Sequence, residues 1–352
     1  MSSHQFRTAL WLRLGIDDVI YPTEAAAAVV REYREKKTEL TQVINAMPNH
    51  TDADVAPQPH TKKLQHYYYS YLSRRDTQAF TDKISNSGEL HDKARILSAE
   101  GSFAGAWLHN VPTKQELQMS SHQFRTALWL RLGIEFASRP NRCSCKEAPV
   151  ITKHLDHLLY CPLFNGVKKR RHDNLVREIK SLCQHAGLNF IDPRLGELRT
   201  PLNDDNKATD GHIQGLYQRS LYIDVTVCNP TCKYYLDKGS AMQQHCAIDI
   251  REDAKEKMYK NRCLPFQGDF MAIAFETYGA CSKKFDDFLK TVTNLAAQKN
   301  HVEPGVLLNY WRKRISTCLQ VGNANIISDA FIYLFDQGGG NLTIDYSVES
   351  TL

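Results

Sequence analysis

The segment that most constrains the fold of this chain is a short apolar run with one acidic residue in its middle. The run extends from Arg219 to Pro230, and most of its central residues are β-branched or aromatic. Such residues favour β-structure, and Asn229 and Pro230 end the run, so we predict a buried strand. Asp224 lies at its centre, and burying a carboxylate is costly unless a cation or a metal ion pairs with it. The simpler alternatives are a strand end that reaches solvent and a structural ion pair.

A second aspartate and a lysine-bearing helix flank this predicted strand. Asp210 begins a stretch that we predict to be a hairpin arm leading into the strand. Two adjacent strands would bring Asp210 and Asp224 to the same edge of a sheet, where two carboxylates repel each other unless a divalent cation lies between them. The helix predicted for residues 241–260 carries Lys255 and Lys257. A lysine there would stabilise a pentavalent phosphate or position the attacking water.

Upstream of the strand, three cysteines and a histidine have spacing typical of a zinc site. Cys143 and Cys145 form a Cys-x-Cys pair, and His157 and Cys161 form a His-x-x-x-Cys pair. Residues four apart share one helix face, so both pairs can face one point, and three thiols with one imidazole suit tetrahedral Zn²⁺. His154 is a competing ligand, with a spacing less suited to the same turn. Four protein ligands leave no open position, which predicts a structural zinc ion. Unrelated cysteines near a surface histidine are the alternative.

A basic cluster directly follows these candidate metal ligands. It consists of Lys168, Lys169, Arg170, Arg171 and His172. An amphipathic helix is predicted for residues 173–183, and a basic cluster at a helix start opposes the helix macrodipole. A phosphate partner would relieve that opposition. Two interpretations stay open, a solvated charge run and contact with the backbone of a nucleic acid.

Composition indicates an ordinary globular protein. Of the 352 residues, 42% are hydrophobic and 24% are charged, which argues against wholesale disorder. The net charge of +5 permits a nucleic-acid partner without demonstrating one. The sequence has no apolar run long enough to cross a bilayer and no signal-peptide cleavage site, so we expect a nuclear or cytoplasmic protein that is neither secreted nor bound to a membrane. The ten cysteines are then expected to be mostly reduced.

The order of these features divides the chain into successive segments. Residues 1–16 recur letter for letter at 119–134 with a helical pattern that ends in glycine, and we place no function in the first copy. A second apolar run at 270–279 adds a strand to the predicted sheet. We predict a poorly defined N-terminal segment, a helical region, a zinc knuckle, an α/β domain with a small mixed central sheet flanked by helices, and a loose tail. These segments cover residues 1–64, 65–142, 143–165, 166–335 and 336–352.

The motifs occur in a characteristic order. The series is Cys-x-Cys, His-x-x-x-Cys, Arg-His-Asp-Asn, Asp210, Ile-Asp-Val-Thr-Val and Lys-x-x-x-Tyr. It resembles the C-terminal region of non-LTR retrotransposon polyproteins, in which a zinc knuckle precedes a restriction-like endonuclease. The similarity covers roughly residues 90 to 330, and the series in this order is fairly specific although each motif alone is weak. The resemblance implies the PD-(D/E)xK fold, a mixed central sheet flanked by helices that cuts DNA with a divalent metal ion.

Carried over by position, the resemblance implies a role for each motif. Cys143, Cys145, His157 and Cys161 match the zinc knuckle, and Arg171, His172 and Asp173 match the basic motif after it. Asp210 and Asp224 match the two metal-binding acids, and Lys255 matches the helix lysine, with Lys257 as its substitute. The implied cofactors are a structural Zn²⁺ and a catalytic Mg²⁺.

The chain also departs from the family pattern. Thr209 stands where the family usually has proline, Met258 stands at the second lysine of Lys-x-x-Lys-Tyr, and the sequence contains no Phe/Tyr-x-Asp-Asp turn of a reverse-transcriptase core. One hypothesis is a Mg²⁺-dependent DNA endonuclease, and another is a catalytically inactive nucleic-acid-binding remnant with a zinc knuckle. DNA is the expected partner in both, with RNA and a reverse transcriptase of the same element as further candidates. A helical interaction protein without a nucleic-acid role is the third hypothesis.

Overall fold

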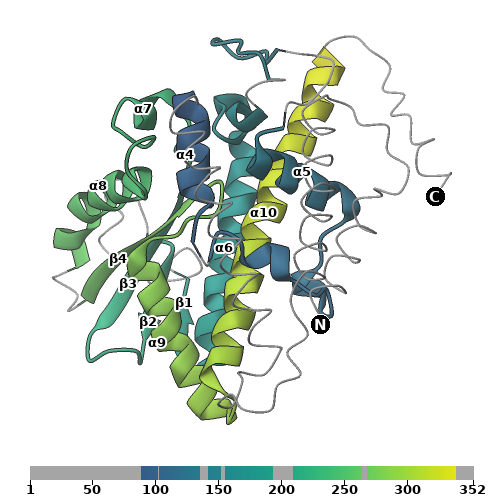
Figure 1. Ribbon diagram of the computed structural model, residues 1–352. Coiled ribbons are helices and arrows are strands. Elements are labelled where there is room, and N and C mark those ends of the chain that lie inside the picture. The colour runs from purple at the N-terminus through teal and green to yellow at the C-terminus, as the bar shows by residue number, and fades with distance from the viewer. Residues whose placement is uncertain are drawn as a thin grey trace, which may run out of the picture. The chain divides into compact units, whose positions relative to one another are not determined.

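The computed structural model describes residues 89–101, 103–134, 142–151, 155–192, 209–263 and 268–337 (Figure 1). The chain divides into two units, Met1–Asp82 and Lys83–Leu352, and all described residues belong to the second. The first copy of the duplicated segment, the expected N-terminal segment and the expected tail beyond residue 337 lie outside the described residues.

A four-stranded mixed sheet lies at the centre of the described part. Its strands are β1 (Asn189–Ile191), β2 (Gly211–Gln214), β3 (Ser220–Cys228) and β4 (Gly268–Glu276), and they are adjacent in that order. β1, β2 and β3 pair antiparallel, whereas β3 and β4 run parallel along their whole length. A parallel pair needs a crossover connection, which here contains helix α8 (Cys246–Cys263). The expected mixed sheet with flanking helices is therefore confirmed.

Side-chain alternation gives β3 two different faces. Ile223 and Val225 are buried in the main hydrophobic core on one face. Asp224 lies between them and therefore points to the opposite face, toward α8, beside Ala272 of β4 in the strand register. Because Asp224 is only 4% exposed, a strand end that reaches solvent is excluded.

Helices cover both faces of the sheet (Figure 1). The main core joins β1 to β4 with α6 (Asn165–His185), α9 (Lys283–Asn300) and α10 (Pro304–Gln337). Its largest fully buried side chains include Phe275 of β4, Phe285 of α9 and Trp311 of α10. On the opposite face, Ala247 and Ile248 of α8 pack with Ala274 of β4, so small residues let the crossover helix lie close to the sheet. The described part also contains the shorter helices α4 (Leu90–Ala99) and α7 (Lys233–Leu236).

The second copy of the duplicated segment forms helix α5 (Ser121–Leu132), as predicted. Ser120 and Gln123 make a reciprocal capping box at its start, in which each side chain bonds the backbone N–H of the other. Gly133 ends the helix in the left-handed conformation, with φ 66°, which glycine adopts without a steric penalty.

Two helix boundaries differ from the sequence predictions. α6 begins at Asn165 instead of residue 173, so the basic cluster lies within the helix and its side chains spread around it. α8 begins at Cys246, because the residues before it form turns. β1 has only three residues and was not predicted.

None of the described helices combines the length and the apolar character that crossing a membrane requires.

Arg171 and Gly322 hold α6 close to α10. A Cβ atom on Gly322 would lie 2.4 Å from Cγ of Arg171, so only glycine leaves room for this side chain. The Nη1 group of Arg171 donates to Oδ1 of Asn323 at 2.6 Å. Nδ2 of Asn323 in turn donates to the carbonyl of Thr277, just after β4, at 2.7 Å. This chain of contacts fixes α6 relative to the ends of the strands.

Replacing Gly322 with alanine tests this close approach. Alanine is preferred over glycine within helices by about 1 kcal/mol, yet Gly322→Ala should lower the free energy of unfolding by about 1 to 3 kcal/mol because it overpacks the contact. The matched control is Gly166→Ala in α6, where a Cβ meets no atom within 4 Å. Urea denaturation measures both variants. Equal or higher stability of Gly322→Ala would contradict the contact.

Candidate functional site

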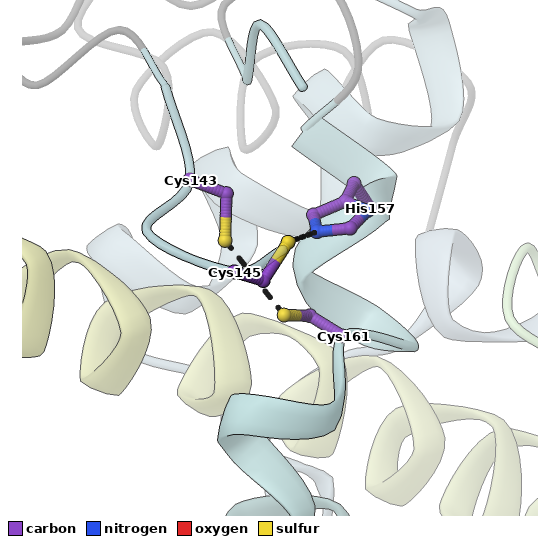
Figure 2. A group of neighbouring side chains, drawn as sticks. All are labelled: Cys143, Cys145, His157 and Cys161. Carbon is purple, nitrogen blue, oxygen red and sulfur yellow. Dashed lines mark hydrogen bonds between the residues drawn. The ribbon is translucent and has the colours of Figure 1, made fainter. Parts of the chain in front are cut away.

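The four predicted zinc ligands converge on one point (Figure 2). Their ligand atoms all lie within 4.8 Å of one another. Sγ of Cys143 lies 3.7 Å from Sγ of Cys161, and Sγ of Cys145 lies 3.3 Å from Nε2 of His157. Figure 2 shows Cys143 and Cys145 on a loop and the other two residues on the facing helical turn. Apart from Cys145, which is half-buried, these residues are buried.

Local backbone bonds and an apolar shell shape this cluster. The backbone N–H of Cys143 donates to the carbonyl of Pro149 at 3.1 Å, closing the loop that carries the first pair. The N–H of Cys161 donates to the carbonyl of His157 at 2.9 Å, so the second pair spans one helical turn. A separate hydrophobic cluster packs the site against α10. It includes Ile151, Leu158, Phe164, Ile326, Ile327 and Ala330.

The chemistry of the four donors suits Zn²⁺. Burial raises the pKa of Cys161 to about 12 and also raises the pKa of Cys143. Buried thiols of this kind are neutral without a metal ion, so binding would release protons. Three sulfur atoms and one nitrogen complete a tetrahedral set with no position left for substrate. The cluster can therefore hold a metal ion in a structural role.

A cavity of about 550 Å³ opens beside the cluster and contains both predicted acidic residues. α6, β3, α8, the turn before α6 and the segments next to the strands contribute to its wall. Its charged and imidazole side chains are Lys168, Arg171, His172, Asp210, Asp224, Arg251 and Lys255. Four lysines and arginines thus face two aspartates, which makes the cavity cationic.

Asp224 and Lys255 form an ion pair between β3 and α8. Nζ of Lys255 lies 2.8 Å from Oδ2 of Asp224, and the two side chains are 20% and 6% exposed. Burial raises the pKa of Asp224, the negative charge of Asp210 raises it further, and Lys255 acts in the opposite direction. An additional cation nearby would therefore stabilise the ionised form of this carboxylate.

Asp210 is held just before β2 by two hydrogen bonds and a histidine. Its Oδ2 accepts from the backbone N–H of Val225 at 2.7 Å, and its own N–H donates to the carbonyl of Ile223 at 2.8 Å. Nε2 of His172 lies 3.0 Å from the same Oδ2, and Nδ1 lies 3.1 Å from Oδ1 of Asp173. Burial disfavours the charged imidazole and lowers its pKa. The hydrogen bond and negative charge of Asp210, and to a smaller extent those of Asp173, outweigh this effect and raise the pKa of His172 to about 8.

The turn that carries His157 and Cys161 also forms one wall of the cavity. Leu159 and Tyr160, which lie between the ligands His157 and Cys161, line the cavity. Nζ of Lys168 donates to the carbonyl of Tyr160 at 2.9 Å, which joins this turn to α6. The Cys/His cluster and the cavity with the acidic residues therefore share this turn.

A buried polar network joins the same turn to the end of β3. Asp156 precedes the ligand His157, and its Oδ2 accepts from Oγ1 of Thr231 at 2.6 Å and from Nδ2 of Asn229 at 3.1 Å. Its Oδ1 lies 3.0 Å from Nε2 of His91, in α4. Asn229 lines the cavity, so this network sets the position of the turn relative to the strand end.

The remaining predicted residues take different positions. Lys169 and Arg170 are exposed, and Arg170 pairs with Asp329 of α10, so neither belongs to the cavity wall. Lys257 is exposed on α8 and does not line the cavity, which leaves Lys255 as the helix lysine. Arg171 lines the cavity but is only 5% exposed. His154 lies outside the described residues.

Sequence reasoning missed several residues of the cavity wall. Arg251 precedes Lys255 by four residues and Thr226 follows Asp224 by two, so their spacings alone place them on the same faces as the predicted pair. Tyr160 and Asn229 carry no such signal, because only the packing of distant segments brings them to the cavity.

Substitution of one ligand tests the metal cluster. Cys161→Ser should reduce the zinc content of the purified protein from about one ion per chain and lower its free energy of unfolding by several kcal/mol, because metal binding is coupled to folding. Plasma mass spectrometry and thermal melting measure the two effects. Cys318→Ser is the control, since Cys318 is a free cysteine of α10 outside the cluster. Full zinc content in Cys161→Ser would exclude the cluster as the binding site.

The imidazole of His172 provides a test of the acidic side of the cavity. Its pKa in the metal-free protein should be about 8, above the ordinary value of 6.5. Asp210→Asn should lower this pKa more than Asp173→Asn does, because the bond to Asp210 contributes more. The raised pKa means that the folded state is stabilised below pH 6.5 and that this contribution is lost as pH rises through about 8. NMR titration of the imidazole protons measures the shift, and equal effects of the two variants would be inconsistent with this geometry.

Comparison of the chain with models of protein families and with curated proteins finds no match in either case. The chemical character of the site thus follows from its own residues. They form a closed set of thiol and imidazole donors and, beside it, a cationic cavity with two carboxylates.

Proposed function

We propose that the chain is a metal-dependent endonuclease that hydrolyses phosphodiester bonds of DNA, on a restriction-like fold with a structural zinc knuckle. The observation that carries this proposal is the grouping of Asp210, Asp224 and Lys255 in one cavity. Residues from two neighbouring strand regions and one crossover helix meet there, in an arrangement that suits a divalent cation and a phosphate. The excess of lysine and arginine on the wall favours a polyanionic substrate.

The two carboxylates are suited to hold Mg²⁺. Oxygen ligands are those that Mg²⁺ prefers, and burial, followed by the negative charge of Asp210, raises the pKa of Asp224. A bound Mg²⁺ would lower the pKa of a water molecule and neutralise charge on the phosphate. Asp210 is oriented for this role by the backbone N–H of Val225 and by His172.

Lys255 carries the remaining chemical role. Its ammonium group lies 2.8 Å from Asp224 and 5.6 Å from the centre of the Tyr259 ring, which holds the side chain over the cavity. From this position it would stabilise the negative charge that develops on the phosphate during hydrolysis. Lys168, donating to the carbonyl of Tyr160, would contact the backbone of the substrate on the facing wall.

A second candidate function is supported by the same ion pair. Lys255 already balances the charge of Asp224, so the carboxylate is compensated without a metal ion. This favours a nucleic-acid-binding protein in which the zinc knuckle is intact and the nuclease centre is inactive. DNA is the proposed partner in both cases. RNA, and a reverse transcriptase encoded by the same element, are proposed as further partners.

Cleavage of supercoiled plasmid separates the two functions. With Mg²⁺ or Mn²⁺ the wild-type protein should nick or linearise the plasmid, and Asp224→Asn and Lys255→Ala should each reduce the rate at least about 100-fold, as loss of a transition-state contact does. Lys257→Ala should retain activity, because Lys257 does not line the cavity.

DNA binding and zinc content of the same samples complete the experiment. An electrophoretic shift by wild-type protein and variants, together with normal zinc content, shows that the variants are folded. Binding without cleavage by any of the proteins would support the inactive remnant. Cleavage that survives in Asp224→Asn would refute the proposed catalytic centre.

A further inference from the structure

Two polar side-chain contacts link β3 to α8 among the described residues, and only one of them is electrically neutral. Asp224 pairs with Lys255 at 2.8 Å. The second contact joins Thr226 to Arg251, whose Nε donates to Oγ1 of the threonine at 3.2 Å. Because Thr226 lies two residues after Asp224 and Arg251 one helical turn before Lys255, both contacts occupy the same faces of strand and helix. The second contact leaves the charge of the guanidinium uncancelled.

Arg171 is a second guanidinium on the wall of this cavity. It is only 5% exposed, and Asn323, a neutral partner, accepts from its Nη1. Within the described ranges its Nε has no hydrogen-bond partner, and no carboxylate pairs with Arg171 or Arg251. Arg171 is buried, and burying a cation without a counter-charge is costly, whereas Arg251 is exposed at the mouth of the cavity. An anion bound in the cavity would remove that cost.

The two guanidinium groups share a neighbour at the end of β3. Arg171 and Arg251 both interact electrostatically with Cys228. Burial raises the pKa of the Cys228 thiol well above its usual value, so the thiol is neutral and does not balance either charge. The part of the cavity wall near Thr226 therefore carries the unbalanced positive charge, whereas Asp210 and Asp224 carry the acidic side.

We propose that Arg171 and Arg251 hold a phosphate group of the nucleic-acid backbone next to the one that is hydrolysed at Asp210 and Asp224. Two residues along a strand span about 6.6 Å, and four residues along a helix span about 6 Å. Both lengths are close to the separation of successive phosphates along a strand of nucleic acid. Thr226 positions Arg251 by accepting from Nε, which leaves the two terminal nitrogens of the guanidinium fork for phosphate oxygens.

This inference deepens the proposed function and rests on it for the identity of the neighbouring phosphate. It adds a substrate requirement, because the substrate must extend at least one nucleotide beyond the bond that is cut. The binding role itself does not need catalysis, so it can be measured without cleavage.

The salt dependence of DNA binding tests the proposal. A fluorescently labelled duplex oligonucleotide is titrated with protein over a series of salt concentrations in buffer without divalent cations, and anisotropy gives the affinity. The logarithm of the binding constant K falls as the logarithm of the salt concentration rises, and each phosphate contact makes this slope steeper by about 0.9. Arg251→Gln should make the slope shallower by about one such contact and weaken binding at least about tenfold. Arg251→Lys should keep the slope, since it keeps the charge, but bind more weakly because it lacks the fork.

The matched control is Lys238→Gln, which removes one positive charge from an exposed residue outside the cavity wall. It should leave the slope unchanged. Arg171→Gln is measured as a second variant, with thermal melting to check its fold, and should show the same loss of slope as Arg251→Gln. Equal slopes for Arg251→Gln and Lys238→Gln, or no binding of the duplex by the wild-type protein, would overturn the proposal.

Cleavage by the wild-type protein in Mg²⁺ separates this proposal from the proposed function. Cleavage together with an unchanged slope in Arg251→Gln would remove the phosphate site and keep the endonuclease. A lower slope without any cleavage would keep the phosphate site and remove the endonuclease.

Discussion

The buried ion pair between Asp224 and Lys255 is the interaction on which the architecture of the site depends. A carboxylate on the inner face of a central strand must meet a cation, so the packing of α8 on β3 is limited to orientations that present Lys255 at that position. The helical period then decides what else faces the cavity. Arg251 lies one turn earlier, and Tyr259 lies one turn later, where its ring packs 5.1 Å from that of Phe270 in β4. One electrostatic requirement thus selects the helix face that lines the site.

Charges within the cavity are distributed unevenly. Asp224 has Lys255 and Asp210 has His172, so each carboxylate has a basic partner of its own. The guanidinium groups of Arg171 and Arg251 have only neutral partners within the described residues. This distribution gives the cavity a balanced end, where an added divalent cation offsets the repulsion of two aspartates, and a positive end, where an added anion offsets the arginines. The proposed substrate, a phosphate ester bound together with a divalent cation, would meet both demands at once.

Local patterns in the sequence predict much of this arrangement. Alternating apolar residues identify β3, and the spacing of two cysteines, a histidine and a further cysteine identifies a cluster whose donor atoms do converge. The sequence also places Asp210 in the strand region beside Asp224. The sequence pattern does not specify how each helix is rotated about its own axis, and therefore which of its side chains face the cavity. The pattern names Lys255 first but keeps Lys257 as its substitute, and it groups Arg171 with a basic run, because the contact with Gly322 that buries Arg171 joins residues far apart in the chain. The three residues of β1 are too few to show any period.

The turn from Leu155 to Cys161 belongs to two structures at once. Asp156 bonds to the strand end, His157 is one of the four residues that could hold a metal ion, and Tyr160 lines the cavity. A substitution in this turn therefore has pleiotropic effects, and a genetic screen will score damage to the Cys/His cluster and damage to the cavity as one phenotype. The spacing between the two ligands cannot change by insertion or deletion without moving the wall between them. Divergence of such a chain is thereby restricted to paired changes, in which the metal site and the cavity vary together.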